Sequence, residues 1–194
     1  MKKIQDHYFK EARKQGYVAR SAFKLEEMDR KFRLLRRGQH VIDLGCAPGS
    51  WLQYAAKKVL PEGSLTGVDL KQVKIQFPEG VRILQSDIYM LEESILASSR
   101  FDLVLSDMAP DTTGIPSVDS QRSYDLNSQA LSFAQRHLKP GGTLVLKAFQ
   151  GEPLNRLKSE IRACFESFKL FKPKSSRSES VEIFVLGFGL LPQS

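Results

Sequence analysis

Charged residues stand at the ends of apolar segments, where they could act on a bound ligand. Apolar strands are expected at residues 64–69, 81–85 and 101–107, and they close on Asp69, Asp87 and Asp107. A further apolar segment, 143–147, closes on Lys147. In open α/β sheets the ligand lies outside the carboxyl ends of the parallel strands, so these side chains should gather there. Lysine and aspartate at such an edge form either a structural ion pair or a positioned base with its orienting acid.

A glycine-containing turn precedes these strands and predicts a nucleotide-like ligand. Residues 41–44 are expected to form a buried strand, 45–49 a tight turn and 50–60 a helix. Glycines let the backbone approach a ligand, and the amides of a helix N-terminus point at its polar groups. The pattern Asp-x-Gly-x-Ala-x-Gly lacks the Gly-x-Gly-x-x-Gly fingerprint, which disfavours an NAD-dependent dehydrogenase. The candidate ligand-binding residues in this turn are Asp43, Gly45, Ala47, Pro48 and Gly49.

The strand-end aspartates have positions that suit a nucleoside. Asp69 follows Gly45 by 24 residues, close to the offset of about 20 at which an acidic residue holds ribose hydroxyls. Asp87 would then accept a hydrogen bond from the exocyclic amine of adenine. Either aspartate alone could equally be a helix cap or a turn residue, but the ordered set after the glycine turn favours a binding role.

The order of the expected elements indicates an α/β protein. Strands alternate with helices, expected at 50–60, 88–98, 125–138 and 154–164, which argues for a parallel, doubly wound sheet. Segments 165–171 and 181–188 are expected to pair and close it. Residues 111–120 are expected to form a Pro/Gly/Ser/Thr-rich loop on the ligand side, and 139–142 a turn. No internal repeat or linker is evident, so residues 1–194 are expected to form a single domain.

The net charge of +7 is concentrated in the first 37 residues, which hold 12 Lys/Arg and 5 Asp/Glu. A basic segment with interspersed aromatic residues, here Tyr8, Phe9 and Tyr17, is typical of nucleic-acid binding, although a solvated tail is the alternative. An amphipathic helix is expected at 22–32 and carries Lys24. The cysteines are expected to be free thiols, the histidines show no metal-ligand spacing, and no apolar segment is long enough to span a membrane.

The combination of motifs resembles the FtsJ/RlmE family of ribosomal RNA 2′-O-ribose methyltransferases. The matching segments are SAFKL at 21–25, DLGCAPGSW at 43–51, SDMAP at 106–110, LKAFQG at 146–151 and the stretch from 175 to 182. The resemblance implies a Rossmann-like S-adenosylmethionine (SAM)-dependent methyltransferase fold. Its sheet would have seven mostly parallel, doubly wound strands and an antiparallel closing strand. Cys46, Ser50 and Phe184 differ from residues common in the family, on a scale that affects packing only.

The resemblance also implies site residues and roles. The family's Lys-Asp-Lys-Glu tetrad matches Lys24, Asp107, Lys147 and Glu182, and its SAM-contacting positions match Gly49, Trp51, Asp69, Asp87 and Asp107. We expect Lys147 to act as the base for a ribose 2′-hydroxyl, with its pKa lowered by Lys24. Asp107 would orient Lys147, and Glu182 would position Lys24 or the ribose. No metal is required by this scheme.

The resemblance implies ribosomal RNA as the partner, as free RNA or in the assembled large subunit, with a uridine of the peptidyl-transferase-centre loop as the target. SAM would be the cofactor and would be converted to S-adenosylhomocysteine. The protein is expected to be a monomer in the cytoplasm, or in the mitochondrial matrix if the chain is a processed eukaryotic form. Alternatives are methylation of tRNA, methylation of a base nitrogen or a small molecule, and a non-catalytic RNA-binding role in ribosome assembly. The lysine pair and the Asp-Met-Ala-Pro turn at 107–110 favour an oxygen acceptor.

Overall fold

A mixed sheet runs through the middle of the computed structural model, which describes residues 2–91, 100–177 and 179–192, with side chains from residue 7. Within these ranges seven strands pair in the order β3-β2-β1-β4-β5-β7-β6. Their bounds are His40–Leu44 (β1), Ser64–Asp69 (β2), Val81–Gln85 (β3), Phe101–Ser106 (β4), Leu138–Phe149 (β5), Phe165–Phe171 (β6) and Glu182–Leu190 (β7). Strands β1 to β5 pair in parallel, whereas β7 runs antiparallel to both β5 and β6. The predicted doubly wound, mostly parallel sheet is therefore confirmed.

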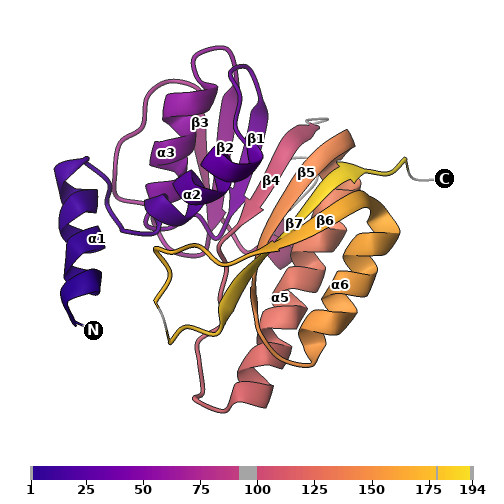
Figure 1. Ribbon diagram of the computed structural model, residues 1–194. Helices are drawn as coiled ribbons and strands as arrows, with labels where there is room; N and C mark the ends of the chain where they lie inside the picture. The colour runs from indigo at the N-terminus through magenta and orange to yellow at the C-terminus, as the bar shows by residue number, and fades with distance from the viewer. Residues whose placement is uncertain (1, 92–99, 178, 193–194) are drawn as a thin grey trace.

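Helices cover both faces of the sheet (Figure 1). Helices α2 (Ala22–Phe32) and α3 (Ser50–Val59) lie over one face, and α5 (Pro116–His137) and α6 (Pro153–Cys164) over the other. A hydrophobic cluster lies on each face of the sheet, and successive residues of a strand point into opposite clusters. Leu103 and Leu105 of β4 pack toward α2 and α3, whereas Val104 packs toward α5 and α6. Burial of a strand on both faces explains the nearly continuous apolar runs in the sequence.

Several expected elements have different bounds in the structure. Of the predicted helix 88–98, residues 88–90 form a 3-10 turn, η1 (Ile88–Met90), and 92–98 lie outside the described ranges. Helix α5 starts at Pro116 instead of 125, because proline is preorganised for the first helical turn. The expected loop 111–120 is correspondingly shorter. Strand β5 starts at 138 instead of 143, so the predicted turn 139–142 lies within the strand. The pairing of β4 with β5 shifts register at this point, between Phe101 and Leu103 of β4.

A helix that the sequence reading did not predict lies at the amino end. Helix α1 (Lys2–Lys14) extends beside α2 at the margin of the molecule (Figure 1). Ala12 is buried, and Tyr8 packs against the same hydrophobic cluster as Phe23 of α2. The ring centroids of Tyr8 and Phe23 are 5.6 Å apart. These contacts attach part of the basic segment to the folded body.

Asp29 fixes α2 against its neighbours. Its carboxylate is buried and accepts hydrogen bonds from the Leu35 amide at 2.9 Å and the Tyr54 hydroxyl at 2.8 Å. Leu35 lies in the segment that leads to β1, and Tyr54 lies on α3. A single side chain thus joins the end of α2 to the elements on either side of it, and α2 is the helix that carries Lys24.

We expect Asp29→Ala to lower the free energy of unfolding by about 2–4 kcal/mol, because two buried donors lose their acceptor. Urea unfolding followed by Trp51 fluorescence measures this change. Glu26→Ala is the matched control on the same helix, since Glu26 pairs with the exposed Arg30 and should cost less than about 1 kcal/mol. Equal costs for the two variants would show that Asp29 does not anchor the helix.

Candidate functional site

A cavity of about 440 Å³ opens at the carboxyl ends of the parallel strands. Its polar lining includes the predicted residues Asp69, Asp87 and Asp107, together with Gly45 and Ala47 of the turn after β1. Its apolar lining comes mainly from Leu44, Val68, Leu70, Ile88, Met108 and Leu126. The structure thus brings these five predicted residues to one cavity, at the sheet edge where α/β proteins bind ligands.

Backbone contacts shape the turn at the bottom of this cavity. Asp69 accepts hydrogen bonds from the Ala47 amide and the Lys71 amide, both at 2.8 Å, so its carboxylate position is fixed. Gly45 has a positive φ of 78°. A Cβ atom there would lie 2.5 Å from Cγ of Met108. Glycine is therefore required at this position by both conformation and space.

Other residues predicted from the turn motif lie away from the cavity lining. Gly49, with φ of 110°, precedes α3 and packs near Ile75. Pro48 follows a cis peptide bond. Trp51 is 2% exposed, and its indole N–H donates to the Ser21 carbonyl at 2.9 Å while its ring lies 5.9 Å from that of Phe184. In this structure Trp51 joins α3 to the start of α2 and to β7.

Asp43 is a buried carboxylate beside the cavity. It is 1% exposed, and neither of its oxygens has a hydrogen-bond partner among the residues that the structure describes. Burial, followed by the negative charges of Asp107 and Asp69, raises the pKa of Asp43 well above its usual range. Acidic side chains therefore crowd this end of the cavity, and their mutual repulsion would be relieved by a cationic ligand.

The predicted tetrad forms as a pair of ion pairs. Lys24 Nζ lies 2.7 Å from Glu182 Oε1, and Lys147 Nζ lies 2.9 Å from Asp107 Oδ1. The lysine side chains are 12% and 9% exposed, respectively. Lys147 Nζ also donates a hydrogen bond to the Asp107 carbonyl at 2.5 Å, and this backbone bond holds the amine at the end of β4.

The sheet register places these residues together. Asp107 follows Ser106, which pairs with Leu146 in the parallel β4–β5 ladder, so Asp107 lies beside Lys147. In the antiparallel β5–β7 ladder, Glu182 pairs with Phe149, two residues after Lys147. Residues two apart on a strand face the same side, so Lys147 and Glu182 project from the same face of the sheet. Helix α2 covers this face and supplies Lys24.

A second cavity, of about 360 Å³, adjoins the tetrad. Lys147 and Glu182 line it together with Phe149, Gln150 and residues around Val181. Ala109 lines both cavities, and Asp107 lines the first. The Lys147–Asp107 pair therefore lies between the two cavities. From this position the Lys147 amine can reach a ligand in the second cavity and also lies close to a ligand in the first.

Asp119 shapes the wall of this second cavity and was missed by sequence reasoning. Its carboxylate accepts hydrogen bonds from the Thr113 amide at 2.7 Å, the Thr113 hydroxyl at 2.8 Å and the Gly114 amide at 3.1 Å. The bond from the Thr113 amide is the main cause of a lowered pKa for Asp119. An acidic residue in the first turn of a helix that starts at proline is a signal that could have drawn attention to Asp119.

Glu182 is held ionised by its neighbours. Burial alone would raise its pKa, but the charge and hydrogen bond of Lys24, the Ser176 hydroxyl and the more distant charge of Lys147 outweigh burial and lower it. Ser176 donates to Glu182 Oε1 at 2.7 Å. The influence of both lysines on one carboxylate shows that the four tetrad residues form a single charged cluster.

Within the described residues, no group of three or more His, Cys, Asp or Glu side chains is placed to hold a metal ion. No described helix is both long and apolar enough to cross a membrane. Cys46 and Cys164 are free thiols, and burial, with the nearby charges of Asp43 and Asp69, raises the pKa of Cys46.

Acidification should remove the stability that Glu182 contributes. A carboxyl whose pKa is lower in the folded state than in the unfolded state stabilises the fold above its ordinary pKa of 4.5 and loses this contribution as the pH falls through the folded value. We expect Glu182→Gln to be less stable than the wild type at pH 7, and the difference to shrink below about pH 4.5. Urea unfolding from pH 7 to pH 3 measures it. A difference that stayed constant across that range would contradict the assignment.

Comparisons with known proteins agree with this geometry. The FtsJ-like methyltransferase family matches residues 17–190. A protein named ribosomal RNA large subunit methyltransferase E from Desulfatibacillum aliphaticivorans is 46% identical over 186 residues, which cover 95% of this chain and 90% of the relative. The protein of the same name from Oleidesulfovibrio alaskensis is 43% identical, with 97% of this chain and 93% of the relative covered.

Solved structures show the same fold. The crystal structure of a protein provisionally assigned as a ribosomal RNA methyltransferase from Plasmodium falciparum superposes with a TM-score of 0.81 at 28% identity. The superposition covers 91% of this chain and all of that one. A more distant structure from Lactococcus lactis, at 15% identity and a TM-score of 0.64, shares the fold alone. The family match over residues 17–190 and the 43–46% identity to these relatives show that the chain belongs to the FtsJ-like methyltransferase family.

Proposed function

We propose that this protein transfers a methyl group from SAM to a ribose 2′-hydroxyl of ribosomal RNA. The observation that carries the proposal is the position of Lys147. Its amine, held by Asp107, lies between a nucleoside-sized cavity at the strand ends and a second cavity that Glu182 lines. Methyl transfer to a hydroxyl requires a methyl donor on one side, an acceptor on the other and a base where the two meet.

The first cavity has the chemistry needed for SAM. In this proposal Asp69 accepts hydrogen bonds from the ribose hydroxyls and Asp87 from the adenine amine, and both line the cavity together with apolar side chains that include Leu44 and Ile88. SAM carries an ammonium and a sulfonium, and the crowded, partly unpaired carboxylates around Asp43 would be relieved by such positive charges. When bound, SAM supplies the methyl group, and the product is S-adenosylhomocysteine.

In this scheme the tetrad positions and deprotonates the acceptor. Lys147 first releases one proton to solvent, and its neutral amine then orients the 2′-hydroxyl and takes its proton. Asp107 holds the amine in place through its carboxylate and its carbonyl. Lys24, paired with Glu182, holds the sugar-phosphate at the rim of the second cavity. Alignment of the reacting groups can contribute about 7–11 kcal/mol in favourable cases, so the scheme needs no metal ion.

The choice of ribosomal RNA is supported by the relatives named ribosomal RNA large subunit methyltransferase E and by the distribution of charge. The net charge of +7 comes from residues 1–37, and α1 and α2 place part of that segment on the side of the sheet that carries Lys24. Such a basic surface suits RNA phosphates. We propose a uridine in the peptidyl-transferase-centre loop as the target, because an unpaired loop nucleotide enters a cavity at the lowest cost.

The carboxylate cluster should act in opposite directions on the free protein and on SAM binding. Asp43→Asn removes a buried carboxyl whose ionised form is disfavoured by burial and by the charges of Asp107 and Asp69, so the free protein should become more thermally stable. SAM binding should weaken by about tenfold as the attraction for its positive charges falls. Thermal shift and calorimetric titration with SAM measure the two effects. Asp125→Asn, at an exposed position of α5, is the control. Unchanged SAM affinity in Asp43→Asn would refute the role of the cluster.

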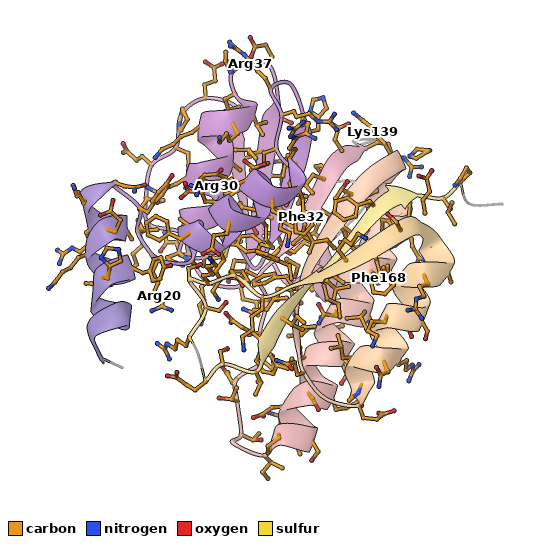
Figure 2. The ribbon with its side chains drawn as sticks, viewed as in Figure 1. Arg20, Arg30, Phe32, Arg37, Lys139 and Phe168 are labelled. Carbon is orange, nitrogen blue, oxygen red and sulfur yellow. The ribbon has the colours of Figure 1, made fainter. Side chains whose placement is uncertain are left out.

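Removal of the proposed base should abolish methyl transfer without preventing SAM binding. Lys147→Ala is expected to lose about 10²–10⁴-fold in kcat while its affinity for SAM stays close to that of the wild type. Lys139→Ala changes a lysine near the start of the same strand, eight residues before Lys147, and should remain active; Figure 2 labels Lys139. Transfer of a radiolabelled methyl group to RNA gives the rates. A Lys147→Ala protein with the wild-type rate would eliminate this residue as the base.

The same assay tests the substrate. Free ribosomal RNA, isolated large subunits and tRNA are offered separately, and the labelled product is digested with alkali, because a 2′-O-methyl group makes the adjoining linkage resistant. Labelled, alkali-resistant dinucleotides from ribosomal RNA are the expected result. Label on tRNA alone, on a base, or on no RNA would contradict the proposal.

A further inference from the structure

The segment that follows β6, residues 172–177, is attached to α2 by hydrogen bonds to its backbone. The carboxylate of Glu27 accepts from the Lys174 amide at 2.7 Å and from the Ser175 amide at 2.8 Å, one with each oxygen. The guanidinium of Arg20, just before α2, donates to the Ser175 carbonyl at 2.8 Å. We call these three contacts the α2 clamp. Figure 2 shows Arg20 beside this segment, far from Arg37 and Lys139.

The clamp joins to α2 a segment whose other hydrogen bonds include one from the Ser176 amide to the Pro173 carbonyl at 3.1 Å and one from Lys172 Nζ to the Ser180 carbonyl at 2.8 Å. Ser175 is 1% exposed, whereas Lys172, Lys174 and Arg177 around it are exposed. A segment without helix or strand structure holds its shape only where its backbone groups find partners. Here the partners of two successive amides and a carbonyl come from a helix about 150 residues away in the sequence.

The same segment leads directly into the tetrad. Ser176, the residue after the clamped Ser175, donates its hydroxyl to Glu182 Oε1, the oxygen that pairs with Lys24. Lys24 and Glu27 are three residues apart on α2, so they lie on the same face of the helix. The clamp and the Lys24–Glu182 ion pair therefore join the same two elements at adjacent points.

We propose that Glu27 and Arg20 are positioning residues that fix segment 172–177 on α2, so that Glu182 stays paired with Lys24 at the acceptor cavity. Without the clamp the segment would separate from α2, Ser176 would no longer orient the Glu182 carboxylate, and the rim of that cavity would lose its shape. The consequence for catalysis rests on the proposed function, but the attachment of the segment does not.

Limited digestion with trypsin tests the attachment independently of activity. In the wild type the bond after Lys174 is protected, since the Ser175 amide is bound to Glu27 and Ser175 is buried. Glu27→Ala should raise the cleavage rate after Lys174 by about tenfold or more. Trypsin cleaves the opened segment, and in this variant the segment can open without breaking the hydrogen bonds to Glu27. Glu27→Gln keeps one acceptor oxygen and should give an intermediate rate. Glu26→Ala, the neighbouring glutamate paired with Arg30, should behave as the wild type.

Steady-state kinetics on the same variants test the effect on the tetrad. Glu27→Ala should lower kcat for methyl transfer by about tenfold, whereas its SAM affinity should not change, because the clamp does not contact the strand-end cavity. Glu27→Gln should recover part of the rate, in parallel with its cleavage rate. A merely structural role would lower the melting temperature of Glu27→Ala and leave kcat unchanged.

The outcomes separate this inference from the proposed function. Rapid cleavage together with reduced kcat in Glu27→Ala supports the positioning role. Wild-type cleavage, or rapid cleavage with wild-type kcat, overturns it while the proposed function stands. If the wild type itself transfers no methyl group to RNA, the proposed function fails and the catalytic part of this inference fails with it, but the cleavage rates still decide whether the clamp exists.

Discussion

The ion pairs Lys24–Glu182 and Lys147–Asp107 are the interactions on which the rest of the site depends. Each joins side chains that are largely shielded from water. A shielded charge without its partner is costly, so a change that separates one pair destabilises the site as well as altering its chemistry. The pairs join α2, the end of β4, β5 and β7, which come from the beginning, middle and end of the chain. Folding of the whole domain is therefore required to assemble them.

The sheet topology explains how such distant residues meet. The parallel strands bring the glycine turn, Asp69, Asp87 and Asp107 to a single edge. Strand β7 enters antiparallel between β5 and β6, so that its first residue, Glu182, arrives at the same edge as the last residues of β5. Opposite strand directions are what allow the start of one strand and the end of its neighbour to share a site.

Much of the fold and of the site could be predicted from the sequence, for physical reasons that differ between elements. The predicted strands 41–44 and 101–107 agree with β1 and β4 to within one residue, because strands buried in a parallel sheet appear as short apolar runs. The tetrad contacts were anticipated through the family resemblance, and Lys147 beside Asp107 also from the order of the strands. The start of α5 and the length of β5 were wrong because proline and glycine can lie within an element as well as end it.

The remaining features depend on tertiary contacts that leave no local signal. Helix α1 docks through Tyr8 and Ala12, and Trp51 proves to join α3 to α2 and β7. The Glu27 carboxylate finds backbone amides 147 and 148 residues away, and nothing in the spacing of the sequence points to them. Sequence patterns identified the candidate residues of the site, whereas the contacts that hold them in position required the structure.

The most direct measurement is a crystal structure of the protein with S-adenosylhomocysteine and a short RNA loop that contains the acceptor nucleotide. The account predicts the ribose 2′-oxygen within about 3 Å of Lys147 Nζ, the cofactor ribose at Asp69, and Lys24 and Glu182 still paired beside the acceptor. An acceptor oxygen bound far from Lys147, or a cofactor bound outside the strand-end cavity, would contradict it.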